Sequence, residues 1–99
     1  MVNDVFKGAI GQSVSQVAGV DFGTPVTKVV SVVKPDGTAG TTFTAAEVVV
    51  DDAPTGSWHV LLRSGDVAAV GEYTFQLKVT TASATIVCPP LLVRVYDAL

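Results

Sequence analysis

Residues 65–79 read GDVAAVGEYTFQLKV, a short polar corner that leads into an alternating segment. From Tyr73 onward, large apolar side chains take every second position, and polar side chains take the positions between them. Because successive side chains of an extended chain point to opposite faces, the alternation predicts a strand with one buried face. That face consists of Tyr73, Phe75, Leu77 and Val79.

The composition points to the same class of structure. Valine is the commonest residue and threonine is abundant, whereas the helix-favouring Leu, Lys, Glu and Arg are scarce. β-branched side chains pack well on a pleated sheet and lose rotamer freedom in a helix. A chain of 99 residues can bury one core without a metal ion or a disulfide. We therefore expect a single all-β domain over residues 1–99.

Turn residues recur at the short spacing that is typical of a β-sandwich. The predicted strands are 4–10 and 12–17 (one strand broken at Gly11), 27–34, 41–51 (with a bulge near 45–46), 57–63, the strand around Tyr73, 85–88 and 91–96. Residues 34–38, KPDGT, favour a tight hairpin turn. In the strand 57–63, Trp58, Val60 and Leu62 share one face. These seven or eight short strands predict an immunoglobulin-like, two-sheet antiparallel β-sandwich.

Charge, apolar content and the single cysteine indicate which partners and which cellular compartment the sequence favours. The formal net charge is -3 and charged residues of either sign are few, so no basic stripe is present to bind nucleic acid. The N-terminus has no basic start followed by a long apolar run, and no stretch approaches a membrane span, which predicts a soluble protein made in the cytoplasm. Cys88 is the only cysteine, which suits a reducing compartment. High apolar content with so little charge predicts that some of the surface meets another subunit.

The side chains that could carry chemistry lack the partners that chemistry requires. His59 lies on the face opposite the predicted core, with no nucleophile or second acid-base group near it in the sequence, and is interpreted as a surface or interface histidine. The carboxylates of Asp36, Glu47, Asp51 and Asp52 do not follow a calcium-binding pattern. Cys88 lies between Val87 and Pro89 and is interpreted as a buried thiol. We predict no catalytic residue, no metal site, no cofactor and no small-molecule substrate.

Two aromatic residues leave alternatives open. Trp58 could stack on a sugar, but its alternation with Val60 and Leu62 favours burial in the core. Phe22, in the loop 19–25, could contact a partner or could plug one end of the sandwich. The N-terminal strand, residues 4–17, could also present a free edge to another chain. The predicted partner contacts are therefore Val20, Phe22 and Phe6.

The corner formed by Asp66, Gly71 and Tyr73 resembles the corner before a late strand of immunoglobulin-like domains, in which a tyrosine bonds back to the backbone. Phe75 takes the place of the usual second cysteine. The whole chain is similar to small immunoglobulin-like proteins and modules of tailed bacteriophage virions, including the N-terminal modules of baseplate upper proteins. The shared features are Gly8-x-x-Gly11, the 34–38 turn, the strand with Trp58, residues 64–66 followed by 71–77, and residues 92–96.

That resemblance implies a structural component of the virion, present in many copies, made in the host cytoplasm and held by protein contacts. The first hypothesis is thus a non-enzymatic virion protein that decorates the capsid or attaches at the neck or tail, with other virion proteins and itself as partners. The alternative is a carbohydrate- or cell-surface-binding module that uses Trp58, Phe22 or Tyr96. An enzyme ranks last.

Overall fold

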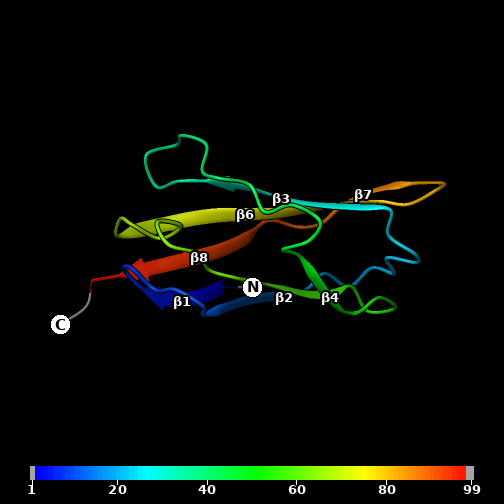
Figure 1. The fold of residues 1–99 in the computed structure, drawn as a ribbon, viewed down its shortest axis with the longest axis horizontal. Coiled ribbons are helices and arrows are strands. Elements are labelled where there is room, and N and C mark those ends of the chain that lie inside the picture. Colours follow the sequence, from blue (N-terminus) through cyan, green and yellow to red (C-terminus); the bar gives the residue numbers. More distant parts are fainter. Residues whose placement is uncertain (1, 98–99) are drawn as a thin grey trace.

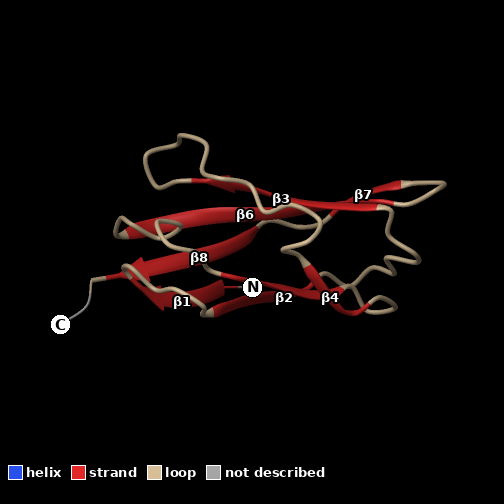
Figure 2. Cartoon of the chain, in the orientation of Figure 1, coloured by secondary structure: helices blue, strands red, loops and turns tan. Residues whose placement is uncertain are grey.

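The computed structural model describes residues 2–97, which form eight strands and no helix (Figures 1 and 2). The strands are β1 (Val2–Phe6), β2 (Ser13–Val17), β3 (Thr27–Val33), β4 (Val49–Asp52), β5 (Ser57–Leu61), β6 (Gly71–Thr80), β7 (Thr85–Val87) and β8 (Leu91–Tyr96). A five-stranded sheet has the order β1-β8-β6-β3, with β7 also paired to β6, and a three-stranded sheet has the order β2-β5-β4. The predicted all-β sandwich is confirmed.

The order of the strands is that of an immunoglobulin-like domain. Strands β2, β5 and β4 correspond to B, E and D of such a domain, whereas β3, β6 and the pair β7 and β8 correspond to C, F and G. The predicted corner is present as well, because the Tyr73 hydroxyl accepts a hydrogen bond from the backbone N–H of Ala69 at 3.2 Å. This bond fixes the chain where it enters β6.

The first two strands depart from the prediction in two ways. Strand β1 runs parallel to β8, so the larger sheet is mixed and not wholly antiparallel. Strands β1 and β2, predicted as one interrupted strand, lie in different sheets, because Gly8 and Gly11 both have positive φ and turn the chain between them. No hairpin joins β1 to β8, so local sequence does not set the direction of this pair.

One hydrophobic core lies between the two sheets. The predicted inner face of β6 is buried along its whole length, and the predicted face of the strand 57–63 is buried with it. The core residues of these two segments are Tyr73, Phe75, Leu77, Val79, Trp58, Val60 and Leu62. The prediction that Trp58 is a core residue is therefore confirmed.

Gln16 is the buried polar side chain of this core. Its Oε1 accepts the indole N–H of Trp58 at 3.0 Å, and its Nε2 donates to the carbonyl of Pro89 at 2.9 Å. Pro89 lies in the interruption between β7 and β8, so Gln16 of one sheet supplies the hydrogen bond that this carbonyl lacks in the other. Because a buried polar atom without a partner costs about 1 to 3 kcal/mol, the bond to Pro89 helps to hold the two sheets together. The bond to Trp58 joins β2 to β5 within the three-stranded sheet.

The prediction of one long strand over 41–51 is wrong, because β4 covers only Val49–Asp52. Phe43 makes an isolated bridge to Val30 of β3, and residues 44–48 form a turn in which the carbonyl of Thr44 accepts from the N–H groups of Glu47 and Val48. The Glu47 carboxylate accepts the Thr44 N–H at 2.9 Å in return. Such Thr-x-x-Glu pairing is half of a capping box, which favours a helical turn over an extended chain.

Candidate functional site

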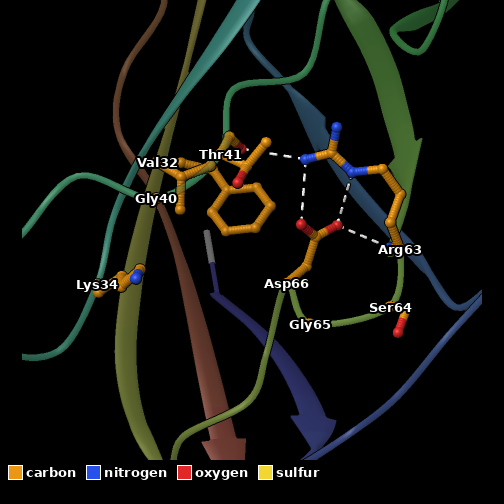
Figure 3. Close-up of a pocket in the computed structure, with 9 residues that line it drawn as sticks. Val32, Lys34, Gly40, Thr41, Arg63, Ser64, Gly65 and Asp66 are labelled. Carbon is orange, nitrogen blue, oxygen red and sulfur yellow. Dashed lines mark hydrogen bonds and ion pairs between the residues drawn. The ribbon is translucent and has the colours of Figure 1, made fainter.

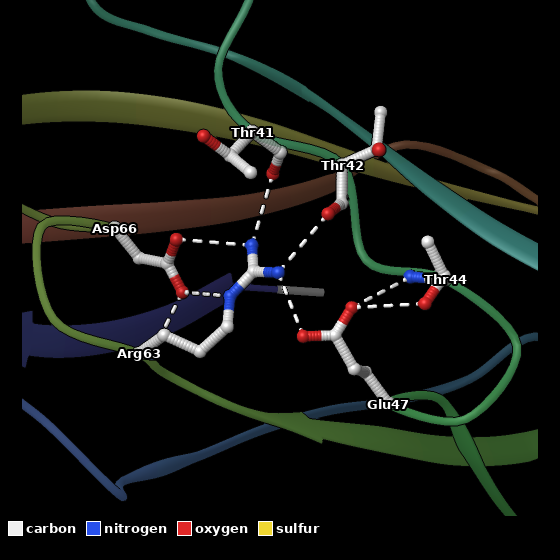
Figure 4. Close-up of polar contacts among 6 residues, drawn as sticks. All are labelled: Thr41, Thr42, Thr44, Glu47, Arg63 and Asp66. Atoms are coloured by element: carbon white, nitrogen blue, oxygen red, sulfur yellow. Dashed lines mark hydrogen bonds and ion pairs between the residues drawn. The ribbon is translucent and has the colours of Figure 1, made fainter.

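Arg63, just after β5, lies at the centre of the most connected polar cluster of the described chain (Figure 4). Its Nε and Nη2 donate to the two carboxylate oxygens of Asp66 at 2.9 and 3.0 Å, and its Nη1 donates to Glu47 at 2.8 Å. The remaining two N–H groups bond the carbonyls of Thr42 and Thr41, both at 3.1 Å. A guanidinium has five N–H donors, so every one of them is used.

Local turn geometry and an aromatic ring hold this cluster in place. The Asp66 carboxylate accepts the backbone N–H of Arg63 at 2.7 Å, and the Asp66 N–H donates back to the Arg63 carbonyl. The guanidinium carbon lies 3.8 Å from the centre of the Phe43 ring, within the range of a cation–π contact. Arg63 therefore ties the 41–47 segment, which follows β3, to the turn between β5 and β6.

The contacts of the cluster favour the ionised forms of Glu47 and Arg63. The backbone N–H of Thr44 is the main reason that the pKa of Glu47 lies below its usual value, and Arg63 adds to the effect. The hydrogen bonds that Arg63 donates to Asp66, and then to Glu47, raise the pKa of Arg63. A guanidinium with all donors used cannot also bind an anionic ligand, so the cluster acts as a structural clasp.

A pocket of about 350 Å³ lies beside this clasp (Figure 3). Its lining residues are Val32, Lys34, Gly40, Thr41, Arg63, Ser64, Gly65, Asp66 and Phe75. Ser64 contributes a hydroxyl and Lys34 an amine to this lining, but among the described residues no hydrogen bond joins Ser64 to Lys34 or to another base. Covalent catalysis uses a nucleophile and a base within hydrogen-bond reach of each other.

His59 lies on the outer face of the three-stranded sheet, where its Nδ1 is 2.8 Å from a carboxylate oxygen of Asp51. The predicted placement away from the core is confirmed. Ser15 is the cross-strand neighbour of His59, so a serine, a histidine and an aspartate share this face. Within the described chain the hydrogen bonds of the His59 ring all go to Asp51, and none joins it to Ser15. A nucleophilic triad requires that second bond.

The other predicted candidates have structural partners. The Asp36 carboxylate accepts from both the side chain and the N–H of Thr38, which lowers the pKa of Asp36, and Asp52 accepts from the Thr55 hydroxyl at 2.9 Å. Cys88 is buried, and burial raises the pKa of its thiol. In residues 2–97, no three His, Cys, Asp or Glu side chains gather as metal ligands would.

The three predicted contact residues differ in their exposure to solvent. Phe6 is 60% exposed and Val20 is 39% exposed, but Phe22 is fully buried, so the expectation that the loop presents Phe22 to solvent is wrong. The N–H of Phe22 donates to the carbonyl of Ala53, and a side chain at Gly56 would come within 2.5 Å of the Val20 carbonyl. This close packing of the loop on the 53–56 turn brings Phe22 into the core, and no periodic pattern in the sequence signals it.

Phe6 and Val20 also do not form one site. The end of β1 and the loop after β2 lie toward opposite ends of a molecule that is 45 Å long and 23 Å wide (Figure 1). The edges of β1 and β2 are joined by side chains. The Asn3 amide bonds both the carbonyl and the N–H of Ser15, at 2.9 and 3.4 Å, and Gln12 Nε2 reaches the Asp4 carbonyl at 3.5 Å.

The fold and these sites define an immunoglobulin-like β-sandwich whose reactive side chains are engaged in structural contacts. Comparison of the chain with protein-family models, with curated proteins and with solved structures gave no match. A search of the described residues for a helix long and apolar enough to cross a membrane found none.

The Glu47 contact predicts a dependence of stability on pH. Because the folded-state pKa of Glu47 is lowered, its contribution is fully present above its unfolded pKa of 4.5 and is lost as the pH falls through the folded pKa. Glu47→Gln should therefore reduce the loss of stability on acidification, as measured by urea midpoints at neutral and acidic pH. Glu72→Gln, in an exposed pair with Arg94, is the control for the same loss of charge. Equal acid sensitivity in Glu47→Gln and the wild type would contradict the prediction.

Proposed function

We propose that this protein is a non-enzymatic structural protein of a bacteriophage virion, which decorates the capsid or attaches at the neck or tail through protein–protein contacts. The proposal starts from the similarity of the sequence to virion modules, which extends over nearly the whole chain. The virion is its working location, and its partners are other virion proteins and further copies of itself.

The exposed apolar side chains are the observation that carries the proposal. Among the residues whose side chains are described, twelve large apolar side chains are exposed on a chain that has only fifteen Asp, Glu, Lys and Arg residues. A surface with so many apolar and so few charged side chains favours contact with other proteins. The exposed set comprises Phe6, Ile10, Val17, Val20, Val26, Val29, Val33, Val49, Leu61, Val70, Val87 and Tyr96.

The hydrogen bonds and ion pairs of the candidate catalytic groups support a non-enzymatic role. Arg63, Glu47 and Asp66 bond one another, and His59 bonds Asp51 on an open sheet face. The carbohydrate-binding alternative relied on an aromatic platform, but Trp58 and Phe22 are both fully buried. Tyr96 is the one residue of that set with an exposed ring, and a single exposed ring is a weak platform for a sugar.

The proposal is tested on particles purified from a phage whose genome encodes this chain. Quantitative mass spectrometry should detect the protein in multiple copies per particle, in a fixed ratio to the major capsid or tail proteins. Its absence from the particles would refute the virion role. A second arm uses Phe6→Ser, which should leave the melting temperature unchanged and reduce incorporation, since Phe6 is a predicted contact residue at the surface.

A further inference from the structure

The first and last strands, β1 and β8, form a parallel ladder that a pull on its two outer ends loads lengthwise. Val2 pairs with Leu92 at one end of this ladder, and Phe6 pairs with Tyr96 at the other. The chain enters β1 at Val2 and leaves β8 at Tyr96, so entry and exit lie at opposite ends of the ladder (Figure 1). Tension between these two points draws the strands past each other. Because the hydrogen bonds of a parallel pair are evenly spaced along it, they all share such a load.

Strand β8 is held firmly in the sandwich. It pairs with β6 from Leu91 to Val95, and its inward side chains Leu91, Val93 and Val95 are buried in the core. Strand β1, in contrast, has β8 as its one strand neighbour within residues 2–97. The attachment of β1 therefore decides how much tension the pair withstands.

Three contacts besides the ladder attach β1 to the sandwich. The Asn3 side chain, through Nδ2 and Oδ1, bonds the carbonyl and the N–H of Ser15, as the backbone of a neighbouring strand would. The Val5 side chain is buried in the core. Just beyond β1, the N–H of Lys7 donates to the carbonyl of Tyr96 at 2.8 Å and extends the ladder by one bond. The edge strand is thus joined to both sheets.

The side-chain pattern of β1 leaves no slipped register into which the strand could slide under load. A shift by one residue reverses the two faces, which exposes Val5 and turns the charged Asp4 inward. A shift by two residues toward the N-terminus keeps the faces but brings Lys7 to the position of Val5. Burying an unpaired carboxylate or ammonium costs more than the hydrogen bonds of a slipped ladder would regain. The ladder must therefore break as a whole.

We propose that β1 and β8 form a tension-bearing clamp, through which the domain carries load between the start of β1 and the end of β8. The clamp is directional. It is strong when the load runs along the two strands, and it is weak when the load separates them from one end, because the bonds then break one after another. A load of the second kind acts between the start of β1 and the start of β8. This role follows from the strand geometry alone and does not rest on the proposed virion role.

Single-molecule force spectroscopy tests the clamp in these two directions. One handle is fused before residue 1. The second is coupled to a thiol, which is appended after residue 99 in one protein and introduced by Pro90→Cys in the other. Cys88→Ala in both proteins leaves one thiol for coupling. The rupture force should be at least about twofold higher with the handle after residue 99, because several hydrogen bonds of similar strength then share the load.

Asn3→Ala tests the attachment of β1, and Thr55→Ala is its matched control. Each variant loses two side-chain hydrogen bonds, those of Asn3 to Ser15 and those of Thr55 to Asp52 in the turn between β4 and β5. Asn3→Ala should lower the lengthwise rupture force, whereas Thr55→Ala should leave it at the wild-type value. Urea midpoints of both variants establish that they are folded.

Three results would each overturn the clamp. They are equal rupture forces in the two directions, a low-force release of β1 before the rest of the domain, and a lengthwise rupture force that Asn3→Ala leaves unchanged. A directional rupture force in a protein that is absent from virions would refute the proposed function and leave this inference standing.

Discussion

Replacing Phe75 with alanine is expected to lower the free energy of unfolding by about 3 to 5 kcal/mol. The Phe75 side chain is fully buried on the inner face of β6, and its ring packs against that of Phe43 with centroids 5.6 Å apart. Truncation removes that aromatic pair and leaves a cavity between the two sheets. The loss is a large part of the roughly 5 to 15 kcal/mol that stabilises a typical domain. Urea unfolding followed by tryptophan fluorescence measures it.

Phe6→Ala is the matched control for this prediction. It removes the same side chain from a position that is 60% exposed, so its urea midpoint should stay close to that of the wild type. An unchanged midpoint in Phe75→Ala would show that β6 does not bury the face assigned to it.

Phe22→Ala is expected to destabilise the protein by a similar amount, about 3 to 5 kcal/mol. Although Phe22 lies in the loop between β2 and β3, its side chain is fully buried, and its backbone N–H bonds Ala53 at the opposite turn. The loop therefore closes one end of the sandwich with an aromatic side chain. A fall in the melting temperature and in the urea midpoint would show that Phe22 belongs to the core.

The neighbouring residue Val20 supplies the comparison, because it is 39% exposed in the same loop. Val20→Ala should have a much smaller effect on stability than Phe22→Ala. If the melting temperature of Phe22→Ala equalled that of the wild type, the Phe22 side chain would have to lie at the surface. The prediction that Phe22 contacts a partner would then stand.

Sequence patterns predicted well those features that depend on neighbouring residues. The alternation in β6 identified its buried face, and the residues of the 34–38 turn predicted a tight turn in which Gly37 has positive φ and Lys34 bonds Thr38. The Tyr73 corner was predicted from its resemblance to the corner of immunoglobulin-like domains, and its tyrosine bonds an amide only four residues upstream. For the buried face of β6 and for the 34–38 turn, local spacing alone carries the information.

The candidate polar site could not be predicted in the same way. Arg63 bonds Glu47, sixteen residues earlier, and two carbonyls more than twenty residues earlier. The Thr44-x-x-Glu47 pattern was a usable local signal for the turn that presents this carboxylate, but apolar and β-branched residues around it favoured a strand instead. Of the four carboxylates considered in the sequence, Glu47 pairs with Arg63 and Asp51 pairs with His59.

The sequence by itself determined the all-β class, the number of short strands and the core faces of β5 and β6, because backbone alternation and turn chemistry act over a few residues. Only the tertiary structure decided that β1 runs parallel to β8, that Phe22 is buried and that Gln16 joins the two sheets. Each of these features is a contact between segments that are far apart in the sequence. Such contacts are set by the packing of the two sheets as a whole, which local sequence patterns do not encode.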